Sequence, residues 1–244
     1  MVVETALKGR LADVYMPALV SGAVAALSHR LGEHATIDDP VFGRASSSSS
    51  IDLLLGQIST RFRDEGASYE HIASATGVDR DVSEGVITMN GAVLPVVVVA
   101  ERRRLREIEL RVYYASGASP RKPRPPLLNE GEDVAIPQIV VHVLEALRKG
   151  AVERVLAAFE EGSRWVAPSG ATYGKKDGAM ASFIAELGGR MEFIPAGAAD
   201  DGRTCCVEAV VTRQRPLEDP EPAALSFQRG ESGLLRELRL YYEP

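Results

Sequence analysis

The chain has 244 residues, a comfortable length for two domains of about 120 residues that each bury their own core. With 45% hydrophobic and 25% charged residues, its composition is that of an ordinary globular protein. The net charge of -6 argues against a nucleic-acid or anionic-membrane partner, because such partners attract basic surfaces.

The beginning of the chain has no long apolar run, and its first residues include Lys8 and Arg10, so we do not expect a signal peptide. Two amphipathic helices are predicted to follow. Apolar residues recur at helical spacing over 7–19 and again over 24–31, and Gly22 separates the two runs. Pro17 is expected to kink the first of these helices.

A third helix is predicted over Ile51–Phe62, where Ser49 and Asp52 have the spacing of a capping box. The serine run Ser46–Ser50 just before it is expected to be a flexible loop at the mouth of a pocket.

Strands are predicted to complete this half of the chain. Asn90-Gly91 is a typical hairpin turn, and the apolar run Val93–Ala100 is typical of a buried strand and too short to cross a membrane. In the last strand, 107–114, apolar and charged residues alternate, so one face of the strand is expected to pack on the core and the other to face solvent. Helices followed by antiparallel strands predict an α+β domain, with helices packed on one face of a curved antiparallel sheet. Such a sheet encloses a dead-end pocket suited to an apolar ligand.

The same pattern occurs twice. Glu109-Leu110-Arg111 and Glu237-Leu238-Arg239 lie 128 residues apart, and the same offset relates the tyrosine pairs that follow them. It also carries Gly22 onto Gly150. One offset that holds at separated places indicates a tandem duplication.

Three segments follow from this duplication: a first domain over 1–118, a proline-rich linker over 119–133 and a second domain over 134–244. The solvent-facing sides of the two duplicated sheets can pack against each other, so we expect the two domains to form an intramolecular pseudo-dimer. Whether the chain also assembles as a homo-oligomer is left open.

The segment from His34 to Val41 resembles the Ala-Thr-x-x-Asp-Pro-Val stretch of ketosteroid isomerases, in which the Asp before the Pro is the general base. It also resembles the matching stretch of the tandem-domain polyether epoxide hydrolases of the lasalocid type. The resemblance implies a pair of cone-shaped, cystatin-like domains of the SnoaL-like kind. It nominates Asp39 as the base, and Tyr15 as the catalytic Tyr by its spacing from Gly22 and Asp39.

The polyether enzymes pair their Asp with a Glu, and the resemblance places that partner at Glu65, with Asp64 as the alternative. Opening an epoxide with an internal hydroxyl needs one group that protonates the epoxide oxygen and one that accepts the hydroxyl proton. The resemblance therefore implies an acid/base cyclase or epoxide-opening enzyme for an apolar, polyketide-like molecule, with no metal or cofactor. Asp39 before Pro40 is equally typical of a turn residue.

Two departures from the family pattern bear on function. Where the isomerases carry a protonated Asp on a late strand, this chain has Val96–Val99, which weighs against a double-bond isomerase. In the second repeat, Ala167 stands at the position of Asp39 and Val143 at that of Tyr15, while Glu192 lies roughly where Glu65 lies. The second domain is therefore predicted to be a degenerate, structural partner.

The alternative function is a non-catalytic protein of the same fold that binds a hydrophobic ligand or another subunit, because fold does not fix function.

Cys205 and Cys206 are adjacent, and bridge geometry disfavours a disulfide between neighbours, so both are predicted to be free strand thiols. Free thiols are typical of a reducing cytoplasm.

Overall fold

The computed structural model describes residues 8–103, 107–115, 135–213 and 221–242. These residues divide into two compact units, unit 1 up to Tyr114 and unit 2 from Ala115 onward. The predicted linker over 119–133 lies outside the described residues. Each unit is a helix-and-sheet domain, and the face-to-face pseudo-dimer stays a prediction.

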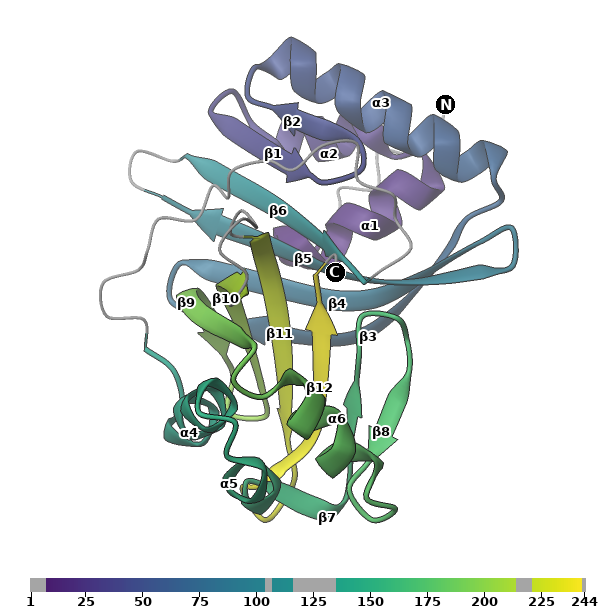
Figure 1. Ribbon diagram of the computed structural model, residues 1–244. Helices are drawn as coiled ribbons and strands as arrows, with labels where there is room; N and C mark the ends of the chain where they lie inside the picture. The colour runs from purple at the N-terminus through teal and green to yellow at the C-terminus, as the bar shows by residue number, and fades with distance from the viewer. Residues whose placement is uncertain (1–7, 104–106, 116–134, 214–220, 243–244) are drawn as a thin grey trace. The chain divides into compact units, whose positions relative to one another are not determined.

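Unit 1 has the expected order of helices and strands (Figure 1). Its elements are α1 (Leu11–Ser21), α2 (Val24–Leu31), β1 (Ala35–Asp39), β2 (Gly43–Ala45), α3 (Ser48–Asp64), β3 (Ser68–Thr76), β4 (Arg80–Met89), β5 (Ala92–Arg102) and β6 (Ile108–Tyr114).

The six strands of unit 1 form one sheet in the order β2-β1-β6-β5-β4-β3. The sheet is mixed and not wholly antiparallel as predicted, because β1 pairs with β6 in parallel, with Ile37 opposite Leu110. The long connection between these two strands permits the parallel pairing, which a tight hairpin does not. The other neighbours pair antiparallel.

The helices lie on one face of this sheet and share a core with it (Figure 1). α1 ends at Gly22, whose φ of 80° is the left-handed conformation that favours glycine at a helix end. Pro17 lies inside α1 on its exposed side, and the helix continues through it to Ser21. The α+β expectation and the helix break at Gly22 are both confirmed.

The start of α3 differs from the prediction. Ser47, not Ser49, is the N-cap: its side chain accepts from the backbone N–H of Ser50, whose hydroxyl accepts in return from the N–H of Ser47. The capping box is therefore made by two serines, and Ser48–Ser50 is the first turn of the helix and not a flexible loop.

The Asn90-Gly91 turn is confirmed. Met89 of β4 pairs with Ala92 of β5, and both turn residues have positive φ, 49° at Asn90 and 78° at Gly91. This is the backbone that a two-residue hairpin of type I′ requires, and Asn-Gly adopts it at little cost.

Unit 2 repeats the architecture, with the sheet order β8-β7-β12-β11-β10-β9 and a parallel pair, β7 and β12. Gly150, with φ of 63°, separates its first two helices as Gly22 does in unit 1. Its elements are α4 (Gln138–Arg148), α5 (Val152–Ala157), β7 (Phe159–Val166), β8 (Thr172–Gly174), α6 (Ala179–Leu187), β9 (Met191–Asp200), β10 (Thr204–Arg213), β11 (Glu221–Arg229) and β12 (Leu235–Tyr241).

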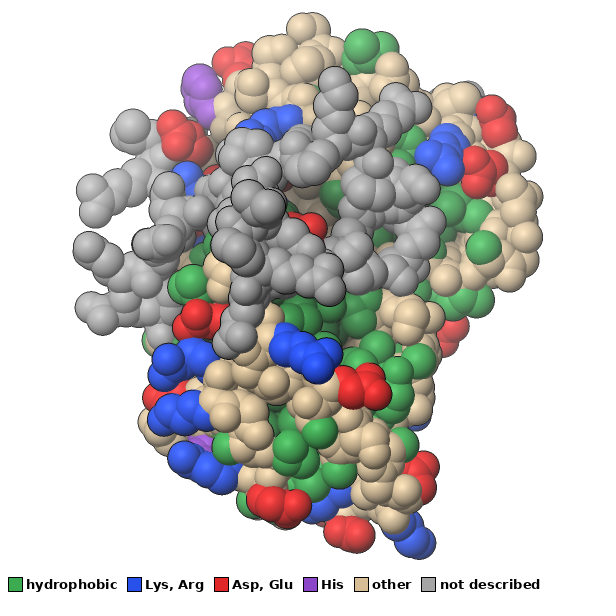
Figure 2. Space-filling view, in the orientation of Figure 1, with side chains coloured by type: hydrophobic (Ala, Val, Ile, Leu, Met, Phe, Trp, Pro, Cys, Tyr) green, Lys and Arg blue, Asp and Glu red, His purple; other side chains and the backbone are tan. Residues whose placement is uncertain are grey.

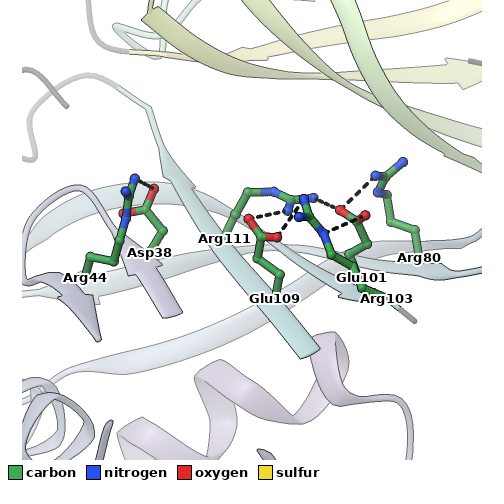
Figure 3. A network of polar contacts seen from close by, with 7 residues as sticks. All are labelled: Asp38, Arg44, Arg80, Glu101, Arg103, Glu109 and Arg111. Carbon is green, nitrogen blue, oxygen red and sulfur yellow. Dashed lines mark hydrogen bonds and ion pairs between the residues drawn. The ribbon is translucent and has the colours of Figure 1, made fainter. Parts of the chain in front are cut away.

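The face of the unit 1 sheet opposite the helices carries a network of ion pairs (Figure 3). Glu101 accepts from Arg111 at 2.6 Å and pairs with Arg80 at 2.9 Å and Arg103 at 3.3 Å. Desolvation alone would raise the pKa of Glu101, but Arg111 and Arg80 outweigh it and lower that pKa to about 2. The ionised network therefore stabilises this face at neutral pH.

Cys205 and Cys206 are buried residues of β10 and form no disulfide, as predicted. Burial, reinforced by Asp200, raises the pKa of Cys205 to about 12, so its thiol is inert at neutral pH.

In the described part of the chain, no helix is both long enough and apolar enough to span a membrane.

Candidate functional site

The pleat of β1 separates two neighbouring aspartates. Asp38 faces outward and pairs with Arg44 at 3.3 Å (Figure 3), whereas Asp39 points into the core and is 0% exposed. The burial pattern of the strand alternates along its whole length. The residue that the resemblance nominates as a base is therefore the buried member of the pair.

Asp39 ends β1 and holds the turn that follows. Its Oδ1 accepts the backbone N–H groups of Val41 at 2.8 Å and Phe42 at 3.0 Å. Its Oδ2 accepts the hydroxyl of Tyr114 at 3.0 Å. Three donors stabilise the negative charge of a buried carboxylate, and the two backbone donors are those of a turn-forming Asp. Asp39 is therefore both a turn-forming residue and a buried carboxylate.

Tyr15 lies on the buried face of α1 and is 0% exposed. Its hydroxyl has no hydrogen-bond partner among the described residues. Burial, followed by the charge of Asp39, raises its pKa well above the usual value, so the phenol stays protonated and remains a donor. An unsatisfied buried hydroxyl costs about 1–3 kcal/mol, which a substrate oxygen would offset.

Tyr114, at the end of β6, is a site residue that sequence reasoning missed. Burial raises its pKa well above the usual value, and the charge of Asp39 and the proximity of Tyr15 raise it further. The structure thus brings Asp39, Tyr15 and Tyr114 together from three separate elements. The tyrosine pair shared by the two repeats is a signal that could have identified Tyr114, since the second tyrosine of the pair ends an alternation of inward-facing residues.

Glu65 stands apart from this buried set. It follows the last turn of α3, and its carboxylate accepts from Arg61 of the same helix at 2.8 Å. With its neighbour Asp64 it lines an open depression of about 600 Å³ on the outer side of α3, formed among the described residues by that helix. The structure therefore gives Glu65 a cation as its partner, not Asp39.

Phe42 and Arg61 connect Glu65 to the buried set. The Arg61 guanidinium lies 5.5 Å from the centre of the Phe42 ring, and Phe42 meets Phe62 edge-on at 6.4 Å. Because the N–H of Phe42 also donates to Asp39, this half-buried ring lies at the closure of the Asp39 turn. Moving the turn would release the backbone bonds to Asp39 Oδ1.

The corresponding place in unit 2 lacks these groups. Ala167 and Val143 are buried and apolar. Tyr242, which corresponds to Tyr114, donates to the sulfur of Met191 at 3.6 Å. Glu192 is an exposed residue of β9, 3.8 Å from Arg148. These residues form no acid/base set.

Charged side chains of both signs are interspersed over the face of the described residues that Figure 2 shows. Lys and Arg do not gather there into a broad basic stripe of the kind that tracks a nucleic-acid backbone.

No protein-family model matches the sequence, and no curated protein sequence is similar to it. Among solved structures, a ketosteroid isomerase-like protein from Catenulispora acidiphila is similar at 18% identity and a TM-score of 0.39, over 45% of this chain and 88% of its own. A candidate polyketide cyclase from Sinorhizobium meliloti is similar at 19% identity and a TM-score of 0.38, over 43% and 94%.

The orange carotenoid protein of Anabaena is also similar, at 17% identity and a TM-score of 0.40, over 45% of this chain but only 37% of that protein. Further neighbours are cystatin-like proteins. At such values the similarities carry no information on activity. The fold assignment rests on the strand order and the helix placement of the two units.

Proposed function

We propose that unit 1 is a cofactor-independent acid/base enzyme for an apolar, polyketide-like small molecule, with Asp39 as proton acceptor and Tyr15 as hydrogen-bond donor. One observation carries the proposal: the Tyr15 hydroxyl is fully buried, has no hydrogen-bond partner in the part of the chain that the structure describes, and lies near enough to the buried Asp39 for that charge to raise its pKa. Paired groups of opposite role in a dry site are what acid/base catalysis requires.

The favoured reaction is ring closure by epoxide opening. Asp39 takes the proton of the attacking hydroxyl, the new C–O bond forms as the epoxide C–O bond breaks, and Tyr15 donates a hydrogen bond to the oxygen released. Asp39 then returns its proton to that oxygen, so the product is an isomer of the substrate and the site is restored. In this scheme Tyr15 takes the donor role that the resemblance gave to Glu65.

Glu65 has a positioning role in this proposal, because it holds Arg61 over the ring that closes the Asp39 turn. Access to Asp39 requires a movement of residues that bury it, since its side chain is 0% exposed, and in this proposal the turn at Val41 and Phe42 is the part that moves. Binding of an apolar substrate would displace Phe42 and release the backbone donors together, which couples substrate entry to activation of the base.

The test uses a 4,5-epoxy alcohol that carries a phenyl group, with product formation followed by chromatography. We expect wild-type turnover above the buffer rate and a loss of about 10²–10⁴-fold in Tyr15→Phe, which keeps the ring and removes the donor. A Tyr15→Phe variant that retains full turnover would overturn the assignment of Tyr15. A β,γ-unsaturated ketone tests the isomerase alternative with the same two groups.

The second candidate is a non-catalytic ligand-binding protein of the same fold. The observation that favours it is that Asp39 already has three donors, which is also what a purely structural turn residue would show. Saturable binding of both probes without product would favour this function over the enzyme.

A further inference from the structure

The inner face of β7 in unit 2 carries two polar side chains that lack hydrogen-bond partners. The indole N–H of Trp165 and the hydroxyl of Ser163 are both buried, at 0% and 2% exposure of their residues, and neither is bonded within the part of the chain that the structure describes. Arg164 between them is exposed and donates to Glu237, so Ser163 and Trp165 share the opposite, inward face.

Two aromatic side chains, Tyr173 and Phe183, lie beside the indole of Trp165. Tyr173 of β8 lies directly opposite Trp165 in the antiparallel pairing, which puts both side chains on one face. Phe183 of α6 meets Trp165 edge-on at 5.5 Å and stacks on Tyr173 at 4.0 Å with an angle of 7° between the rings. We call these three residues the aromatic corner.

The aromatic corner extends from the interior toward the surface. Trp165 is fully buried, whereas Tyr173 and Phe183 are half-buried. The stack of Phe183 on Tyr173 shows that the face of the Tyr173 ring accommodates a flat ring, and a ligand ring that replaced Phe183 there would make the same kind of contact. The position next to Tyr173 is therefore suited to a planar ligand.

An indole can only donate a hydrogen bond, and buried donors in proteins are nearly always satisfied. An acceptor supplied by a ligand would satisfy this N–H, and the neighbouring rings of Tyr173 and Phe183 are only half-buried. From these contacts we propose that unit 2 binds a planar, largely apolar small molecule with a ketone-type oxygen, which accepts from Trp165 while the ring stacks on Tyr173. Ser163 provides a second hydroxyl for polar substituents of the same ligand.

This proposal does not rest on the function proposed for unit 1. Unit 2 has Ala167 where unit 1 has its carboxylate, so the aromatic corner binds its ligand without acid/base chemistry. The second repeat then retains a function of its own, although it has lost the residues of the first.

The single tryptophan of the chain gives a direct test. The full-length protein labelled with ¹⁵N shows one indole N–H resonance, which is titrated with 1-tetralone and, separately, with tetralin, the same bicycle without the carbonyl. We expect 1-tetralone to move the indole proton downfield in a saturable way and to bind roughly fivefold or more tightly than tetralin, the factor for one hydrogen bond. An indole resonance that 1-tetralone does not move would overturn the proposal.

Calorimetric measurement of 1-tetralone and tetralin binding by two variants is an independent test. Trp165→Phe removes the donor and should abolish the preference for 1-tetralone over tetralin. Tyr242→Phe removes a different buried hydroxyl of unit 2 and should leave that preference unchanged. A preference that survives in Trp165→Phe would show that the indole is satisfied otherwise, by a bound water for example, and would contradict the proposal.

Discussion

Tyr114→Phe tests the hydrogen bond on which the buried set depends. The substitution keeps the ring in the core and deletes the hydroxyl that donates to Asp39 Oδ2 at 3.0 Å. Both residues are at most 2% exposed, so water cannot readily replace the lost donor. A hydrogen bond to a charged partner contributes about 1.5–3 kcal/mol, so we expect the free energy of unfolding to fall by about 2 kcal/mol.

Unit 2 provides the matched control. Tyr242→Phe deletes the same atom at the corresponding position, where the hydroxyl donates to the Met191 sulfur at 3.6 Å. Because Ala167 stands at the position of Asp39 in unit 2, we expect this change to lower the free energy of unfolding by less than Tyr114→Phe does. Urea unfolding followed by circular dichroism measures both variants, with the m-value as a check that the compared states are the same. Equal costs for the two substitutions would refute the view that Tyr114 bonds an ionised carboxylate.

Two further predictions concern ion pairs of unit 1, those of Glu101 and that of Glu65. The pKa of Glu101 in the folded chain is about 2, below its usual 4.5, so its contribution to stability is complete above about pH 4.5 and is lost as the pH falls toward 2. Glu101→Gln should therefore lower stability at pH 7 and flatten its decline between pH 5 and 2 in acid unfolding; an unchanged decline would contradict this. Glu65→Gln should reduce turnover of the epoxy alcohol by no more than about tenfold, because it acts through Arg61; a loss of about 10²–10⁴-fold would restore Glu65 as the acid.

Local signals in the sequence predicted much of this fold. Gly22 at a helix end and Asn90-Gly91 at a hairpin could be predicted because few residues other than Gly and Asn adopt the positive φ angles found there. The offset between the repeats is likewise visible without any structure, and it assigned Gly150 the role of Gly22.

Other features depend on contacts that the sequence does not mark. The parallel pairing of β1 with β6 joins strands separated by one helix and four other strands, so no local pattern reveals its direction. Within a run of five serines, spacing alone cannot say which serine caps α3. The bond between Tyr114 and Asp39 spans 75 residues. Arg61 and Glu65 have the i,i+4 spacing of a helix ion pair, but the side of the domain that this pair faces depends on how α3 packs on the sheet.

The neighbouring aspartates of β1 offer the most direct measurement of the central claim, that unit 1 is an acid/base site built on Asp39. Asp39→Asn removes the buried proton acceptor and keeps its shape, while Asp38→Asn makes the same chemical change on the outer face, where the carboxylate pairs with Arg44. Turnover of the epoxy alcohol should fall by about 10²–10⁴-fold in Asp39→Asn and stay within about threefold of wild type in Asp38→Asn, with both variants folded by circular dichroism. Equal turnover in the two variants would contradict the claim.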